Sequence, residues 1–211
     1  RASTDAAFID WGLVDALLEG MVGFWVFCAM PLQWVEAPGR PRFAFANGQV
    51  IGFRGSDYRR LEPHRAVRGS IVDDVDLARQ TKQRGQRVLV LDGTRHFAVH
   101  MYRSGREAVD GFSKNAVSGA GGRGAALVVM VSMVVVWLGP LVLAAQGQGW
   151  AVAAAGLTAL LFGLNCALGG LPAGYGLLYP LAVVLMEYVL ARSLWWHWRG
   201  AVRWKGRSYR L

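Results

Sequence analysis

Long apolar stretches follow a more polar first half along this chain. Residues 125–191 contain a single charged residue, Glu187. Such a run is too long and too apolar for the core of a soluble domain, and it has room for about three membrane spans of ~20 residues each. Short segments rich in glycine divide the run. The pattern therefore predicts three spans, at about 125–145, 150–170 and 174–195.

Residues 8–35 are also apolar, but acidic side chains interrupt them. Asp10, Asp15 and Glu19 recur at near-helical spacing, with apolar residues between them. This spacing predicts an amphipathic helix that lies on a membrane or on a core. A true span is the alternative, because residues 20–35 carry no charge.

The polar section between these stretches shows both strand and helix periods. Short apolar alternation predicts strands, and an N-terminal cap signal followed by a terminating glycine predicts helices. The order of strand, helix and strand predicts an α/β layer. The predicted elements are strands and a turn at 43–54, a helix at 72–84 opened by a capping box from Ser70 to Asp73, strands at 87–91 and 96–101, and a helix at 104–117.

A glycine-rich segment, 118–124, has the composition of a flexible linker. We therefore divide the chain into a polar domain at 1–124, with an amphipathic helix at its start, and a membrane region with a basic aromatic tail at 125–211.

Charge is unevenly distributed over this chain of net charge +9. Residues 1–124 hold 17 Lys and Arg against 13 Asp and Glu, whereas 192–211 hold six basic residues and no acid. Four tryptophans accompany the basic tail, and this mixture at the end of a span is typical of the lipid headgroup region. The composition therefore indicates a membrane surface and not a nucleic acid as partner.

Membrane topology stays open at this point. Three spans place the tail on the opposite side from residues 1–124, although the positive-inside rule favours the cytoplasmic side for both. Either one apolar segment is re-entrant, or residues 20–35 also span, or the tail breaks the rule.

An acidic cluster opens the predicted helix at 72–84. Asp73 and Asp74 lie in its first turn, where carboxylates are favoured by the helix dipole and the free N–H groups. By itself such a pair favours helix-start chemistry, and a general base with an orienting neighbour is the functional alternative. Asp74-Val75-Asp76 has the spelling of a metal-binding Asp-x-Asp motif, but it overlaps this pair.

Two further segments carry candidate ligand contacts. Asn47, Gly48 and Gln49 form a turn signal, or a place where a sugar or phosphate approaches the backbone closely. Arg103, Arg106 and Lys114 lie on or near one predicted helix, where they form a solvated face, a cytoplasmic anchor just before a span, or a clamp for a diphosphate.

The order of these motifs resembles that of the membrane-bound family 2 glycosyltransferases, especially the bacterial carotenoid (chlorobactene-type) lipid glucosyltransferases. The motifs are Asn-Gly-Gln at 47–49, Asp-Asp at 73–74, Met-Tyr-Arg-Ser at 101–104 and Gly-Phe-Ser-Lys-Asn at 111–115. The resemblance covers about residues 40–125 well, and the remainder more loosely. It implies a partial GT-A domain and inverting transfer of a sugar from a nucleotide-sugar donor to a lipid hydroxyl.

The resemblance also assigns roles to residues. Asp74 takes the position of the general base, with Asp73 as its neighbour where the family usually has Glu. Asn47, Gly48 and Gln49 would line the sugar site, and Arg103 and Lys114 would contact the diphosphate. His64 is kept on the acceptor side, whereas the glycines that precede it in the family are absent.

The resemblance covers only the C-terminal half of such an enzyme. The family's metal ligands, an Asp-x-Asp motif for Mg²⁺ or Mn²⁺, precede this region, so we expect no metal site in this chain and little activity from it alone. The processive Gln-x-x-Arg-Trp signature is also absent, which favours transfer of a single sugar.

We therefore expect an integral membrane protein whose catalytic part lies on the cytoplasmic face of the plasma membrane, with a nucleotide sugar and a lipid acceptor, such as a carotenoid or another polyisoprenoid, as its partners. The alternatives are a non-catalytic anchor or partner subunit of a separately encoded catalytic half, and a transport or scaffold protein. Transport is the weaker of the two, because Glu187 is the one ionisable group in the long apolar run.

Overall fold

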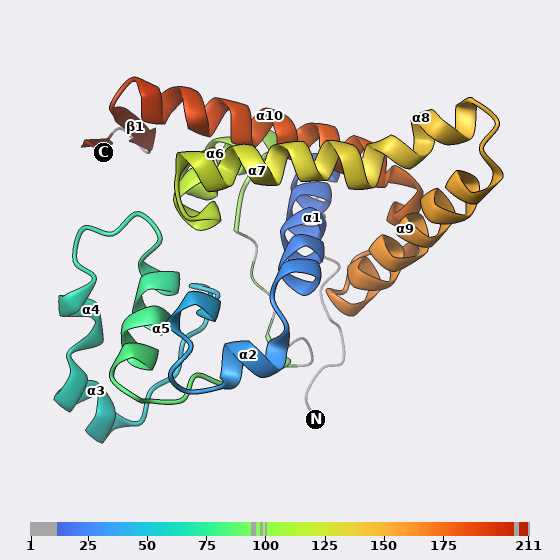
Figure 1. The fold of residues 1–211 in the computed structure, drawn as a ribbon. Helices are drawn as coiled ribbons and strands as arrows, with labels where there is room; N and C mark the ends of the chain where they lie inside the picture. Colours follow the sequence, from blue (N-terminus) through green and yellow to red (C-terminus); the bar gives the residue numbers. More distant parts are fainter. Residues whose placement is uncertain (1–11, 94–95, 98, 100, 205–206, 211) are drawn as a thin grey trace.

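The computed structural model of the chain describes residues 12–93, 96–97, 99, 101–204 and 207–210. These residues form two parts, which Figure 1 shows side by side. A helical bundle contains α1 and α6 to α10, and a smaller polar lobe contains α2 to α5.

The bundle helices are α1 (Leu13–Ala29), α6 (Gly105–Ala120), α7 (Arg123–Met133), the π-helical turn η2 (Val134–Leu138), α8 (Gly139–Ala145), α9 (Gly149–Leu168), the 3₁₀ turn η3 (Ala173–Leu178) and α10 (Tyr179–Trp198). The lobe elements are α2 (Leu32–Glu36), the 3₁₀ turn η1 (Pro41–Phe43), α3 (Gly55–Leu61), α4 (Pro63–Ala66) and α5 (Asp73–Gln83). A C-terminal hairpin pairs β1 (Ala201–Trp204) antiparallel with β2 (Arg207–Arg210), so that Ala201 opposes Arg210.

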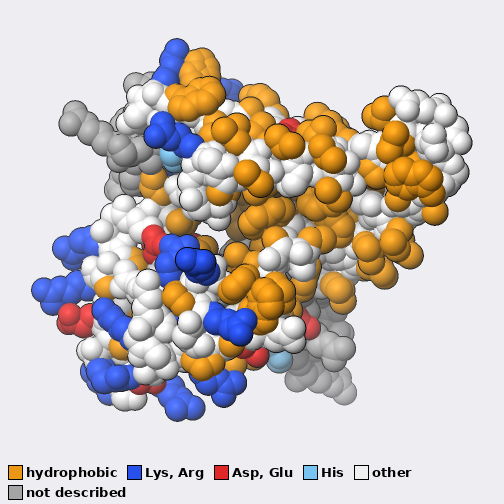
Figure 2. Space-filling model, in the orientation of Figure 1, with side chains coloured by type: hydrophobic (Ala, Val, Ile, Leu, Met, Phe, Trp, Pro, Cys, Tyr) orange, Lys and Arg blue, Asp and Glu red, His pale blue; other side chains and the backbone are white. Residues whose placement is uncertain are grey.

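Three helical segments are long and apolar enough to cross a membrane. They are Arg123–Ala145, Gly149–Leu168 and Ala173–Trp198, and their bounds agree within a few residues with those of the three predicted segments. Figure 2 shows hydrophobic side chains over much of the visible face of the bundle, whereas basic and acidic side chains gather on the lobe. An exterior of this kind suits contact with lipid, because hydrocarbon does not penalise exposed apolar side chains.

A π-helical turn interrupts the first span just before Pro140. Proline has no backbone N–H and its ring clashes with the carbonyl four residues earlier. The wider π turn at Val134–Leu138 lets the helix continue past this residue.

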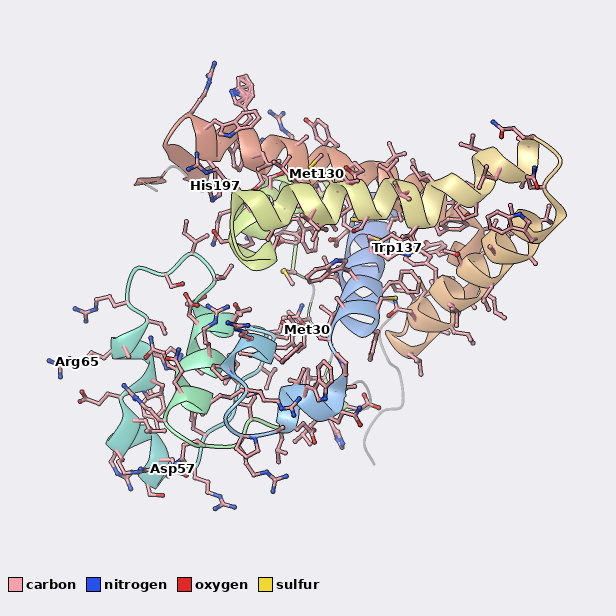
Figure 3. The ribbon with its side chains drawn as sticks, in the orientation of Figure 1. Met30, Asp57, Arg65, Met130, Trp137 and His197 are labelled. Carbon is pink, nitrogen blue, oxygen red and sulfur yellow. The ribbon has the colours of Figure 1, made fainter. Side chains whose placement is uncertain are left out.

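The predicted amphipathic helix exists as α1, and it packs inside the bundle against α6, α9 and α10. Leu17 and Leu18 are fully buried, and the Phe24 ring lies 5.2 Å from the Trp137 ring between centroids, tilted by 45°. Figure 3 shows Trp137 beside α1. This packing agrees with the prediction of a helix that lies on a core.

Close backbone contact joins α9 to η3. A Cβ atom on Gly163 would lie 2.6 Å from the carbonyl oxygen of Ala173, and one on Gly176 would lie 2.4 Å from that of Ala159. Small residues allow membrane helices to approach in this way. The turn after α9 therefore folds back tightly along the same helix.

The α/β layer expected for a partial GT-A domain is not formed, so the predicted fold class is wrong. In the described part of the chain, strands occur only in the hairpin that follows α10. Residues 44–54 and 86–93 form irregular loops. An isolated strand leaves its N–H and C=O groups unpaired, and in this chain the two alternating segments do not pair with each other to form a ladder. The predicted strand at 96–101 lies partly outside the described residues.

Two helices of the polar section are confirmed, with corrections at their ends. The predicted helix at 72–84 is α5, and Gly85 follows it with a φ of +74°. The expected capping box is wrong, because Val72 is the N-cap residue and has no side-chain cap; Ser70 Oγ accepts from the N–H of Val72 over 3.2 Å and donates to Asp76 Oδ2 over 2.6 Å. The helix predicted at 104–117 is α6, which extends to Ala120, so that only Gly121 and Gly122 separate it from α7.

Candidate functional site

The start of α5 lies against the loop that follows η1. The backbone N–H of Gly48 donates to Asp74 Oδ2 over 3.0 Å, a contact between residues 26 positions apart in sequence. Asp74 Oδ1 also accepts from the N–H of Val75 over 2.8 Å. Both carboxylate oxygens are thus oriented by backbone donors, and such charge-assisted hydrogen bonds are stronger than neutral ones.

Gly48 suits this contact because it has no side chain. A Cβ atom at this position would lie 3.2 Å from Asp74 Oδ2 and 3.4 Å from Asp74 Cβ, which is tighter than ordinary packing. The loop itself is fixed by an Asx turn, in which Asn47 Oδ1 accepts from the N–H of Gln49 over 3.1 Å. The structure therefore brings two of the predicted site segments, 47–49 and 73–74, into direct contact.

The site is open to solvent. Asn47, Gly48 and Asp73 are exposed, and Asp74 is half-buried. Asp73 makes no hydrogen bond or ion pair with another described residue, in contrast to Asp74. A carboxylate oxygen has two lone-pair positions, so Asp74 can accept a further proton or hydrogen bond from a ligand.

Asp76 is occupied by structural partners. Its carboxylate accepts from Ser70 and forms an ion pair with Arg79 one helical turn away. Within the described residues, no group of three or more His, Cys, Asp or Glu side chains gathers in a way that could hold a metal ion. The Asp76 carboxylate of the Asp-x-Asp spelling at 74–76 is thus already engaged by partners within the chain.

His64 lies on α4, which packs on α5. Its Nδ1 is 3.0 Å from the hydroxyl oxygen of Tyr58, and the two rings lie 5.6 Å apart between centroids. Both side chains are exposed. His64 is thus oriented on the same lobe as Asp74, and its assignment to the acceptor side stays a prediction.

Arg103 and Lys114 belong to the bundle. The backbone N–H of Arg103 donates to Glu107 Oε2, and Ser104 Oγ accepts from the N–H of Glu107, so these contacts fix the start of α6. This helix packs on α1, α7 and α10, whereas α5 packs on η1 and α4. The structure does not bring the predicted diphosphate contacts to Asp74. The Ser-x-x-Glu capping box at 104–107 is a local signal that the sequence carries and that the prediction of this helix did not use.

A buried lysine is a second feature that sequence reasoning missed. Lys82 on α5 is 1 % exposed, and its Nζ donates to the carbonyl oxygens of Val35, Trp34 and Phe43 at 2.7, 2.9 and 3.3 Å. It thereby joins α2 and η1 to α5, which supports the loop that carries Gly48. No sequence signal distinguishes Lys82 from a surface lysine.

Acidic side chains of α1 form a third group, inside the bundle. Burial, and to a smaller extent the nearby Asp15 carboxylate, raises the pKa of Glu19 to about 7. The pKa of the Tyr102 hydroxyl is also raised, first by burial and then by the carboxylates of Glu19, Asp15 and Glu107. The near-helical spacing of the acidic residues predicted this helix but not the burial of their side chains. Asp10, the first of these acids, lies outside the described residues.

In comparisons with known proteins, no protein-family model, curated protein or solved structure matches the chain.

Proposed function

We propose that this chain supplies the acceptor-side and membrane half of an inverting lipid glycosyltransferase, in which Asp74 is the general base. Asp74 would take the proton of a lipid hydroxyl as that oxygen attacks the anomeric carbon of the sugar. The bond between this carbon and the nucleoside diphosphate would break, and the diphosphate would leave with the bonding electrons. Attack from the opposite face inverts the configuration.

The hydrogen bond from Gly48 to Asp74 carries this proposal. It orients one carboxylate of the acidic pair and places it next to the Asn-Gly-Gln turn, on an exposed surface. These are two of the motifs on which the family resemblance depends. A general base must be held within hydrogen-bond reach of the proton it removes, and an exposed site next to a close backbone approach has room for a sugar.

Three membrane segments in the same chain support a lipid as the acceptor. Chain elements on both sides of the polar lobe belong to the bundle, since α1 precedes it and α6 follows it. A hydrophobic acceptor could therefore remain in the bilayer while its hydroxyl reaches the lobe.

Binding of the nucleotide sugar is assigned to residues outside this site. Arg103 and Lys114 lie on the bundle and not beside Asp74. We derive no step through a metal ion. In this proposal, the donor contacts come from a region that acts together with this chain.

The test is transfer of radiolabelled sugar into organic-extractable lipid. Membranes from cells expressing the complete gene are incubated with UDP-glucose, UDP-galactose or GDP-mannose and a hydroxylated isoprenoid. Removal of a general base is expected to lower the transfer rate by about 10²- to 10⁴-fold in the Asp74→Asn variant. Asparagine keeps the size of the side chain and can still accept the hydrogen bond from Gly48.

Asp57→Asn is the matched control, because Asp57 is an acid of the same lobe that pairs with Arg60 within α3. Figure 3 shows Asp57 at the outer edge of the lobe. The Asp57→Asn variant should retain near-normal sugar transfer. Near-normal transfer by Asp74→Asn would remove Asp74 from the mechanism, and no transfer by the unmodified protein with any of these donors would refute the enzymatic proposal.

A second candidate is a non-catalytic anchor or partner subunit. It is favoured by one observation, that both oxygens of Asp74 already accept backbone N–H groups, which is what a purely structural helix cap does. Under this hypothesis the chain would co-purify with a protein that carries the donor site, and the Asp74→Asn variant would lower the melting temperature without a specific loss of transfer.

A further inference from the structure

An open hollow of about 450 Å³ lies between α6 and α10. Arg106 and Asp110 line it from α6, and Leu185, Tyr188 and Arg192 line it from α10. The three α10 residues follow one another at spacings of three and four, so they share a helix face. The hollow therefore combines an apolar wall with charged groups from a second helix.

The charged groups leave this hollow with one net positive charge. Arg192 forms an ion pair with Asp110, and its guanidinium also stacks over the Trp196 ring at 4.5 Å from the centroid. Arg106 is exposed and makes no ion pair with another described residue. One guanidinium is thus held in place, and a second is available to an anion.

The length of the third span places this hollow near the membrane surface. The segment Ala173–Trp198 has 26 residues, whereas ~20 helical residues cross the ~30 Å hydrocarbon core. The segment is therefore longer than one crossing requires, and its last turns have the Arg and Trp composition of a headgroup region. Arg199 stacks over Trp195 at 4.1 Å, and stacked Arg and Trp side chains at a span end are typical of that region.

Apolar and cationic groups are arranged as a phospholipid requires. Leu185 and Tyr188 lie within the span, and Arg192 lies toward its end. Arg106 reaches the hollow from the neighbouring helix, and long arginine side chains extend their charge toward the headgroups while their stems cover apolar surface.

We propose that this hollow binds an anionic phospholipid, with its phosphate between Arg106 and Arg192 and an acyl chain along Leu185 and Tyr188. Arginine guanidinium groups match phosphate oxygens in two-point contacts. The site does not depend on the proposed glycosyl transfer, because none of its residues belongs to the Asp74 site.

Native mass spectrometry of the full chain in nonionic detergent tests this proposal. Phosphatidylglycerol and phosphatidylcholine with identical acyl chains are the probes, and retention of each lipid is titrated. The unmodified chain should retain phosphatidylglycerol preferentially. Since one basic residue near an anionic surface contributes about 1 kcal/mol, Arg106→Gln should weaken phosphatidylglycerol binding about fivefold.

The Asp110→Asn variant should change the affinity for phosphatidylglycerol in the opposite direction to Arg106→Gln. This change removes the carboxylate and leaves Arg192 free for the lipid, so the affinity for phosphatidylglycerol should rise. A role of Asp110 in fold stability alone would not increase lipid affinity. Weaker binding by Asp110→Asn would therefore overturn the proposal.

Arg65→Gln is the matched control, since Arg65 is an exposed arginine at the outer edge of the lobe. It should leave lipid retention unchanged, and the melting temperatures of all variants report on folding. Equal retention of both lipids by the unmodified chain, or equal losses in Arg65→Gln and Arg106→Gln, would refute the site. Displacement of the lipid by millimolar inorganic phosphate would show that the hollow binds a free anion and not a lipid.

Discussion

Replacing Lys82 by methionine should open the polar lobe. The ammonium group donates to three carbonyl oxygens, those of Val35, Trp34 and Phe43, at 2.7 to 3.3 Å. Methionine has a similar length and no donor. A hydrogen bond to a charged group contributes about 1.5–3 kcal/mol, and each buried carbonyl left without a donor costs about 1–3 kcal/mol.

These losses are partly offset, because methionine is not charged and burial of an ammonium group costs several kcal/mol. Trp34 is exposed, so water can reach part of this region after the change. We expect a net destabilisation of the lobe of about 3 kcal/mol. Domain stabilities are about 5–15 kcal/mol, so this value is large enough to populate local opening without unfolding the bundle.

Hydrogen exchange of the full chain in detergent measures this opening. A loss of about 3 kcal/mol corresponds to about a hundredfold faster exchange. The acceleration should appear in peptides covering 32–43 and 73–83, which Lys82 joins. Peptides from α9 should exchange as in the unmodified protein, since α9 belongs to the bundle.

Arg79→Met is the matched control on the same helix. Arg79 lies three residues from Lys82 and forms a partly exposed ion pair with Asp76. Pairs of this kind contribute about 0–1 kcal/mol, so exchange should change by less than about fivefold. Equal protection in Lys82→Met and Arg79→Met would refute the structural role of the buried ammonium group.

Two further predictions concern the bundle. The pKa of Glu19 is raised from 4.5 to about 7, so its contribution to stability should be fully present below pH 4.5 and be lost as the pH rises through 7. The melting temperature should therefore fall between pH 5 and 8 by an amount equivalent to about 2 kcal/mol. The Glu19→Gln variant should flatten this pH dependence, and an unchanged slope would exclude Glu19 as its source. Gly176→Ala would place a Cβ atom 2.4 Å from the carbonyl oxygen of Ala159 and should destabilise the bundle by about 1–3 kcal/mol in thermal unfolding. Gly174 has open space around it, so Gly174→Ala should not destabilise the bundle. Equal melting temperatures of the two variants would contradict the close packing of α9 and η3.

The membrane segments could be predicted from the sequence because length and apolar composition are enough to define a span. The helices α5 and α6 could be predicted too, because the acidic first turn of α5, the glycine that follows it and the Ser104 cap of α6 are local signals. Strands are different, because the alternating pattern at 43–54 becomes a strand only if another strand pairs with it. That partner is a property of the whole fold, and the prediction failed there.

The candidate site was predicted in its parts and not in its geometry. Gly48 and Asp74 were both expected to belong to the site, but no local sequence signal indicates that residues 26 positions apart are in contact. The burial of Lys82 could not be predicted for the same reason, because its three acceptors are backbone carbonyls, which every residue type has. Arg103 and Lys114 follow the predicted order along the chain, but the fold carries them into the bundle.

The bundle also bears on the topology that the sequence left open. Residues just before the first span are joined to residues at the end of the third, since Asp110 pairs with Arg192 and the N–H of Val117 donates to Ser193 Oγ over 3.1 Å. The hairpin after α10 packs on α6 as well. Contacting groups lie on one side of a membrane, whereas three complete crossings would place these groups on opposite sides.

We therefore predict that one of the three apolar segments turns back before it crosses. The best candidate is α9, because η3 folds back along it through Gly163 and Gly176, and because its Asn165 side chain donates to the Gly20 carbonyl of α1 over 2.9 Å. Polar contacts of this kind are tolerated at membrane depth where protein surrounds them. A re-entrant α9 places the basic tail on the same side as the cationic first half, so that both parts can satisfy the positive-inside rule at once.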